Sequence, residues 1–258
     1  MARKQGSKKP KASNANGPAK SAKAAAAAAE SAKSAAQAGS TSRRAVKEQV
    51  VEAGLALAAE IPWAEIKLQD IAARAKLPLA DVVEVFPTKL SVVCGFMRHI
   101  DRKVIENLDP ELAGEPARER LFDVLIGRFE ALNPYKAGVR SLWQALSRDP
   151  DALMVLDSAV VRSQLAMMAA AGLNAEGLSG MARAQGVAMI FFRTMGVWLE
   201  DEDPGMARTM AALDRHLRDA ERLMRPLQGF GIAARLAGAF CAAFFGRGGD
   251  RTRREEAT

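Results

Sequence analysis

The fold is decided by residues 68–89, which read LQDIAARAKLPLADVVEVFPTK. Apolar residues recur here at intervals of three and four, which is typical of one face of a helix. The spacing predicts two short helices, over about 67–75 and about 79–86, with Pro78 in the tight turn between them. The second helix is expected to turn Leu79, Val82, Val85 and Phe86 inward. Pro87 ends the second helix, because proline disfavours the helical conformation at the residue before it. Two short helices joined by a tight turn form a helix-turn-helix arrangement.

The helical spacing continues on both sides of this stretch. A helix over about 43–60 precedes it, with Val46, Val50, Ala53 and Leu57 on one face. No segment alternates with the period of two that a strand requires, so the sequence predicts an all-α protein. The later helices are expected to be one capped by Thr88 that reaches about Asn107, and others over about 117–132, 135–147, 151–171, 178–199 and 203–224.

The front of the chain, over about 45–100, resembles the TetR family of transcriptional regulators. Three motifs carry the resemblance: Val50–Leu55, Leu68–Ala75 and Phe86–Lys89. The resemblance implies an all-helical fold, in which a helix-turn-helix domain reads operator DNA and a larger helical domain dimerises and binds a small ligand. We expect these domains over 43–107 and 108–225.

By the same resemblance, Lys67 and Lys89 fall where the family contacts DNA phosphates, which position the protein without specifying sequence. The candidate DNA-binding residues are Arg43, Arg44, Lys67, Lys76, Thr88 and Lys89.

The expected reading helix departs from the family pattern. Its outward face carries Ala80, Asp81, Val83 and Glu84. Bidentate readout of bases uses Arg, Lys, Asn or Gln, and carboxylates repel the polyanionic backbone. The scaffold therefore matches the family, whereas the reading face differs from it.

Charge is divided unevenly along the chain, which has a formal net charge of +7. Residues 1–44 hold ten basic side chains and one acidic one, Glu30, so the remainder has a net charge of −2. Residues 1–42 are rich in Ala, Ser and Lys and are predicted to be disordered. We expect this tail to supply non-specific affinity for DNA or for an anionic membrane, the alternative being a solubilising tail without a partner.

The back half, over about 120–245, resembles a lipid-binding accessory family of coenzyme Q (ubiquinone) biosynthesis. The resemblance rests on scattered residues, among them Trp143 to Leu146, Trp198 and Thr209. It implies a TetR-like fold that holds an isoprenoid lipid and ends in an amphipathic membrane helix. On this alternative, the protein is a lipid-binding accessory protein at the membrane, with a front module that no longer reads DNA.

Methionine and aromatic residues recur at helical spacing in the back half. Such residues usually form a core, and the alternative is a chamber for a large apolar ligand. The candidate ligand-binding residues are Trp143, Met167, Met168, Met189, Phe192, Met195 and Trp198.

An apolar segment over 226–246 precedes a charged tail, 247–258. Its only charged residue from Leu227 onward is Arg235, and it contains Phe230, Phe240 and Phe244. A segment of this kind suits either the surface of an anionic membrane or a dimer interface.

Several functional classes are disfavoured. Two cysteines, Cys94 and Cys241, and two distant histidines predict neither a disulfide framework nor a metal centre. Glu200–Asp203 is interpreted as an acidic helix start, with Asp203 as the N-cap and Pro204 in the first turn. No phosphate loop or nucleophile motif is present, so we expect no enzyme and no cofactor. The leading hypothesis is a cytoplasmic, homodimeric, TetR-like regulator that senses an apolar ligand, with peripheral membrane contact under the alternative.

Overall fold

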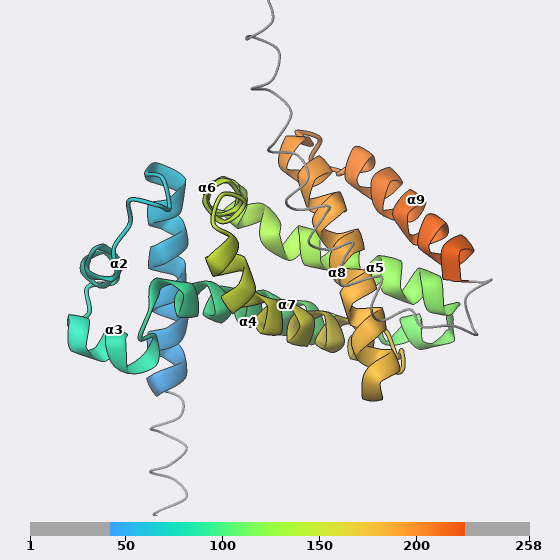
Figure 1. Ribbon diagram of the computed structural model, residues 1–258, viewed down its shortest axis with the longest axis horizontal. Helices are drawn as coiled ribbons and strands as arrows, with labels where there is room; N and C mark the ends of the chain where they lie inside the picture. The colour runs from blue at the N-terminus through green and yellow to red at the C-terminus, as the bar shows by residue number, and fades with distance from the viewer. Residues whose placement is uncertain (1–41, 225–258) are drawn as a thin grey trace, which may run out of the picture. The chain divides into compact units, whose positions relative to one another are not determined.

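A computed structural model describes residues 42–224 of the chain, and every regular element in that range is a helix (Figure 1). The first helix spans 42–60. It is followed by α2 (Leu68–Ala75), α3 (Leu79–Val85) and α4 (Lys89–Glu106). The later elements are the 3₁₀ turn η1 (Pro110–Gly114), α5 (Ala117–Leu132), the 3₁₀ turn η2 (Asn133–Tyr135), α6 (Lys136–Leu146), α7 (Pro150–Ala170), α8 (Gly177–Glu200) and α9 (Ala207–Met224). The predicted all-α class is confirmed, and most helix ends lie within one or two residues of the prediction.

The helix-turn-helix module is built by α2 and α3 together with the first helix and the start of α4. Lys76 ends α2 in the left-handed conformation, with φ of 54°, and turns the chain toward α3. Phe86 packs closely on α4, because a Cβ atom added at Gly95 would lie 2.6 Å from its ring. The predicted cap of α4 is also confirmed: the Thr88 hydroxyl oxygen accepts a hydrogen bond from the Ser91 backbone N–H at 3.1 Å.

Two details of the prediction are wrong. Leu79 was expected to point inward, but 39% of it is exposed. The helix α3 has only seven residues, and Val82 is its one buried side chain, so its first residue extends past the core.

The last described helix begins at Ala207 rather than at Pro204, because Met206 has φ of 53° and interrupts the turn before it. The acidic residues still cap this helix. Asp203 accepts from the Ala207 N–H at 3.1 Å, and Asp201 accepts from both the backbone N–H and the hydroxyl of Thr209.

The larger domain surrounds α7, which packs against α4, α5, α6 and α8, while α9 packs on α5 and α8. By length and composition alone, α7 is also the one helix among residues 42–224 that could cross a membrane, with a mean hydropathy of 1.3. Half of its most apolar window is buried, against its neighbours in the domain. These contacts are those of a core helix.

Candidate ligand cavity and DNA-facing surface

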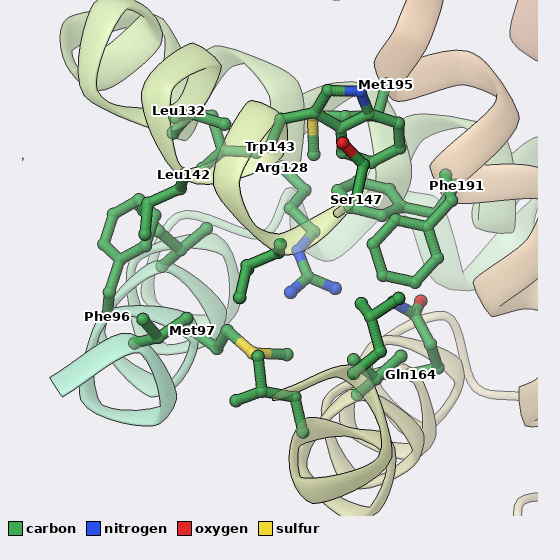
Figure 2. A pocket seen from close by; sticks show the side chains of 18 of the residues that line it. Phe96, Met97, Arg128, Leu132, Leu142, Trp143, Ser147, Gln164, Phe191 and Met195 are labelled. Carbon is green, nitrogen blue, oxygen red and sulfur yellow. The ribbon is translucent and has the colours of Figure 1, made fainter. Parts of the chain in front are cut away.

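A cavity of about 130 Å³ lies among five helices of the larger domain (Figure 2). Its wall is mostly apolar. It is formed by Val93, Phe96, Met97 and Ile100 of α4, Arg128 and Leu132 of α5, Val139, Leu142, Trp143 and Leu146 of α6, with Ser147 after it, Leu153, Leu156, Asp157, Val160 and Gln164 of α7, and Phe191, Phe192 and Met195 of α8.

One charged side chain enters the cavity from its wall. Arg128 is only 4% exposed, and Figure 2 shows its guanidinium group at the centre of the surrounding apolar side chains. Its Nη2 donates to the Ser163 hydroxyl at 2.6 Å and lies 3.0 Å from Asp101 Oδ1. The Ser163 hydroxyl in turn donates to the same Asp101 oxygen at 2.8 Å. The guanidinium also lies over the Phe191 ring, 4.6 Å from its centroid.

Burial is the main cause of the pKa shifts of Asp101 and Arg128. It raises the pKa of Asp101 above the usual range, against the opposing effects of the Arg128 charge and the Ser163 hydrogen bond. Burial likewise lowers the pKa of Arg128, which the Asp101 charge opposes. The two groups compensate each other's charge inside the domain.

Two buried polar atoms of side chains that line the cavity have no hydrogen-bond partner within residues 42–224. They are Nη1 of Arg128 and the amide oxygen Oε1 of Gln164, which is 1% exposed. Both side chains line the cavity. A buried polar atom is normally hydrogen-bonded, so a donor and an acceptor that both lack partners at one cavity need an explanation.

Three of the seven predicted ligand-binding residues, Trp143, Phe192 and Met195, line the cavity. The other four do not belong to its wall. Met167, Met168 and Trp198 are fully buried in the core, where the Trp198 indole donates to the Asn133 side chain at 2.9 Å, and Met189 is half-buried on α8. The residues proposed for a membrane or dimer helix, Phe230, Arg235, Phe240 and Phe244, lie outside the described residues, as does the basic tail up to residue 41.

Sequence reasoning missed Arg128 and Gln164. A signal for both was present, because each interrupts an apolar stripe at helical spacing. Arg128 follows Leu121 and Leu125 on α5, and Gln164 lies between Val160 and Met167 on α7. A polar residue at such a position indicates a buried polar group with a specific partner.

The surface expected to face DNA is acidic and apolar on α3. Ala80, Asp81, Val83 and Glu84 are all exposed, as the sequence predicted. Lys67 and Lys76 are exposed at the two ends of α2, and Arg43 and Arg44 are exposed in the first turn of the first helix.

Lys89 is placed differently from the other candidate DNA contacts. Its ammonium group donates to the backbone oxygens of Trp63 at 2.8 Å and Ile66 at 2.9 Å, and it lies over the Trp63 ring. Burial lowers its pKa. Lys89 therefore links the loop before α2 to the start of α4 through hydrogen bonds. A DNA phosphate that contacted Lys89 would have to share its ammonium group with these backbone oxygens.

Two helices connect the module to the cavity. The helix α4 begins in the module and lines the cavity with its middle turns. The helix α6 lines the cavity as well, and its other face contacts the module. A Cβ atom added at Gly138 would lie 2.7 Å from the Leu55 carbonyl oxygen, and the Ser141 hydroxyl accepts from the Trp63 backbone N–H at 2.8 Å.

Comparison with known proteins supports the fold. No protein-family model matches the chain, and no curated protein matches it. Among solved structures, it is similar to a TetR transcriptional regulator from Nitrosomonas europaea ATCC 19718, with 20% identity and a TM-score of 0.56 over 68% of this chain and 97% of that one. It is also similar to a TetR transcriptional regulator from Rhodococcus sp. RHA1, with 19% identity and a TM-score of 0.52 over 69% and 96% of the two chains.

At this level of identity the likeness establishes the fold. The resemblance of the back half to the coenzyme Q accessory family finds no support in these comparisons. The chain has the TetR-like fold: a helix-turn-helix module at the front and a larger helical domain behind it.

Proposed function

We propose that the protein is a TetR-like transcriptional regulator whose affinity for DNA is set by a ligand in the α4–α8 cavity. The main support for this proposal is that α4 belongs both to the module and to the cavity wall. Its first residue, Lys89, is hydrogen-bonded within the module, and Phe96, Met97 and Ile100 farther along the same helix line the cavity. A ligand that favours one position of α4 therefore favours one position of the module.

The helix α6 offers a second connection. Its contact with the first helix at Gly138 leaves no room for a side chain, so a movement of α6 is transmitted to Leu55 rather than absorbed. Val139, Leu142 and Trp143 on the same helix face the cavity. Coupling of this kind requires that the ligand binds the two states of the protein with different affinity.

The decisive experiment is selection of DNA by the full-length protein from a pool of random duplexes. We expect enrichment of one site, and we expect a ligand of the cavity to change the affinity for that site. If no sequence is enriched, the regulator proposal fails, and the protein is then a ligand-binding protein on a scaffold that does not read DNA.

The basic tail and Lys67 are proposed to contribute electrostatic affinity for DNA. Deleting residues 1–42 should weaken binding to unrelated duplexes and flatten its dependence on salt concentration, because each phosphate contact releases counterions. Lys67→Ala should weaken binding to all sequences alike and lower the salt slope by about one. An unchanged slope in the deletion variant would exclude a role for the tail.

We also propose that the protein acts in the cytoplasm as a homodimer. The start of α8 supports the homodimer, because 84% of Leu178 and 52% of Met181 are exposed on it. Exposed apolar side chains that lie close together are typical of an association surface. Sedimentation of the full chain tests the proposal, with Leu178→Glu/Met181→Glu as the variant; a monomeric wild-type protein would contradict it.

A further inference from the structure

We propose that the cavity takes a neutral amphiphile: a small apolar body that carries an uncharged group able both to accept a hydrogen bond from Arg128 and to donate one to Gln164. A hydroxyl group or a primary amide has this property. The inference rests on the proposed function only in treating the cavity as the effector site. The chemistry of the ligand follows from the lining of the cavity itself.

The two unpartnered atoms require different kinds of hydrogen-bond partner. Nη1 of Arg128 is a donor and Oε1 of Gln164 is an acceptor, and neither has a partner within the described part of the chain. Both side chains are more than nine-tenths buried, and Figure 2 shows the two among the side chains that surround the cavity. A hydrocarbon would satisfy neither atom, a carboxylate would satisfy only the arginine, and an ammonium would satisfy only the glutamine. A hydroxyl group or a primary amide can satisfy both.

The charges at the cavity wall favour a neutral ligand. The Arg128 charge is already compensated by Asp101 at 3.0 Å. The other ionisable side chain on the cavity wall is Asp157, which is half-buried and acidic. An anionic ligand would therefore add an uncompensated negative charge to a region with few polar groups, which is costly. The arrangement favours a neutral ligand over a carboxylate, although an arginine in a cavity would alone suggest the opposite.

The size and the lining of the cavity limit the body of the ligand. The volume of about 130 Å³ is close to that of an apolar protein cavity of about 150 Å³ that binds benzene. Aromatic side chains line much of the wall, and Met97 and Met195 are flexible enough to adapt to a substituent. The ligand body is therefore expected to be about one ring with a short chain.

The test is a matched series of three probes that share the same body: para-ethylphenol, ethylbenzene and para-ethylbenzoate. Each is titrated into the full-length protein by calorimetry near neutral pH. We expect the phenol to bind about tenfold more tightly than the hydrocarbon, as two buried hydrogen bonds would allow, and the benzoate to bind most weakly. Binding of the benzoate as tight as that of the phenol would overturn the proposal. Equal binding of phenol and hydrocarbon, or no binding of any probe, would also overturn it.

Variants assign the preference to the two atoms. Gln164→Met removes Oε1 at similar volume and should reduce the advantage of the phenol over the hydrocarbon to about twofold or threefold. Arg128→Lys keeps a charge for Asp101 but removes Nη1, and it should have the same effect. Gln144→Met, at an exposed glutamine on α6, is the matched control and should change nothing. Retention of the full preference in both cavity variants would overturn the assignment.

These titrations contain no DNA, so their outcome is independent of the regulator proposal. A protein that prefers the phenol and enriches no DNA site would refute the proposed function and support the ligand class. A protein that enriches a DNA site and shows no preference among the probes would do the reverse.

Discussion

The helix-turn-helix module and the larger domain differ in where they hold their polar side chains. Over residues 47–100, every buried side chain is apolar. From Asp101 to Thr209, seven polar or charged side chains are buried, among them Arg128 and Gln164. The module thus has no polar or charged side chain that is fully buried over residues 47–100, whereas the larger domain buries several. A change of one side chain should therefore affect the two regions in different ways.

The largest expected effect concerns the buried ion pair. Arg128→Met leaves Asp101 buried without its counter-charge, and we expect a loss of about 3–5 kcal/mol in the free energy of unfolding. Urea unfolding measures it. In the double variant Arg128→Met/Asp101→Asn no charge remains unpaired, so most of the loss should be recovered. A loss below about 1 kcal/mol in the single variant would mean that the pair is more hydrated than the structure indicates.

The next effect concerns the contact between the two regions. Gly138→Ala places a Cβ atom 2.7 Å from the Leu55 carbonyl oxygen, so the backbone must shift. We expect a cost of about 1–3 kcal/mol, as for overpacking elsewhere. Gly127→Ala is the matched control, because nothing lies within 4 Å of its added Cβ. The control should gain about 0.5–1 kcal/mol from its helical position on α5. Equal stability of the two variants would show that α6 is free to move away from the first helix.

A smaller effect is expected inside the module, at its half-buried cation. Lys89→Met removes hydrogen bonds to the backbone oxygens of Trp63 and Ile66, and we expect a loss of about 1–2 kcal/mol. Lys67→Met, at an exposed position, should cost nothing measurable in the same unfolding experiment. If the two variants are equally stable, Lys89 is available for DNA, and its predicted phosphate contact gains support.

Most of the helices could be predicted from the sequence. The helices follow from apolar residues at three- and four-residue intervals and from caps such as Thr88, which are local signals. The predicted helix over about 117–132 is the observed α5. The start of α9 could not be predicted from such local signals. It depends on Asp201, which lies outside the helix and accepts from the Thr209 N–H, and on the positive φ of Met206.

The candidate site was predicted less completely than the fold. The helical spacing of Met and aromatic residues in the back half left a ligand chamber as the alternative to a core, and Trp143, Phe192 and Met195 do line a cavity. Which such residues face a cavity and which fill the core depends on how five helices pack, which helical periodicity does not specify. In the sequence, Arg128 and Gln164 stand out only because each is a polar residue among apolar residues at helical spacing.

The smallest effect we predict is a dependence of stability on pH through His99. Its Nε2 atom is buried and has no partner within residues 42–224. Burial lowers its pKa most, and the charge of Lys103 lowers it further. Glu48 and Glu52 oppose these two effects, and the charge of Arg102 adds the smallest lowering. The folded protein therefore binds the proton less readily than the unfolded chain does, whose histidine titrates near 6.5. Stability should consequently fall as the pH is lowered through and below that value.

The measurement is the urea midpoint of the wild-type protein and of His99→Gln at about pH 7.5 and about pH 5.5. Glutamine does not titrate, so the variant should lose less stability between the two conditions. His216 has a pKa that is lowered in the same direction, chiefly by burial, so the single variant should keep part of the dependence and His99→Gln/His216→Gln should keep least. The raised pKa of Asp101 acts in the opposite direction, since protonation of that group is easier in the folded state. An identical loss in the wild-type protein and both variants would assign the pH dependence to groups other than the two histidines.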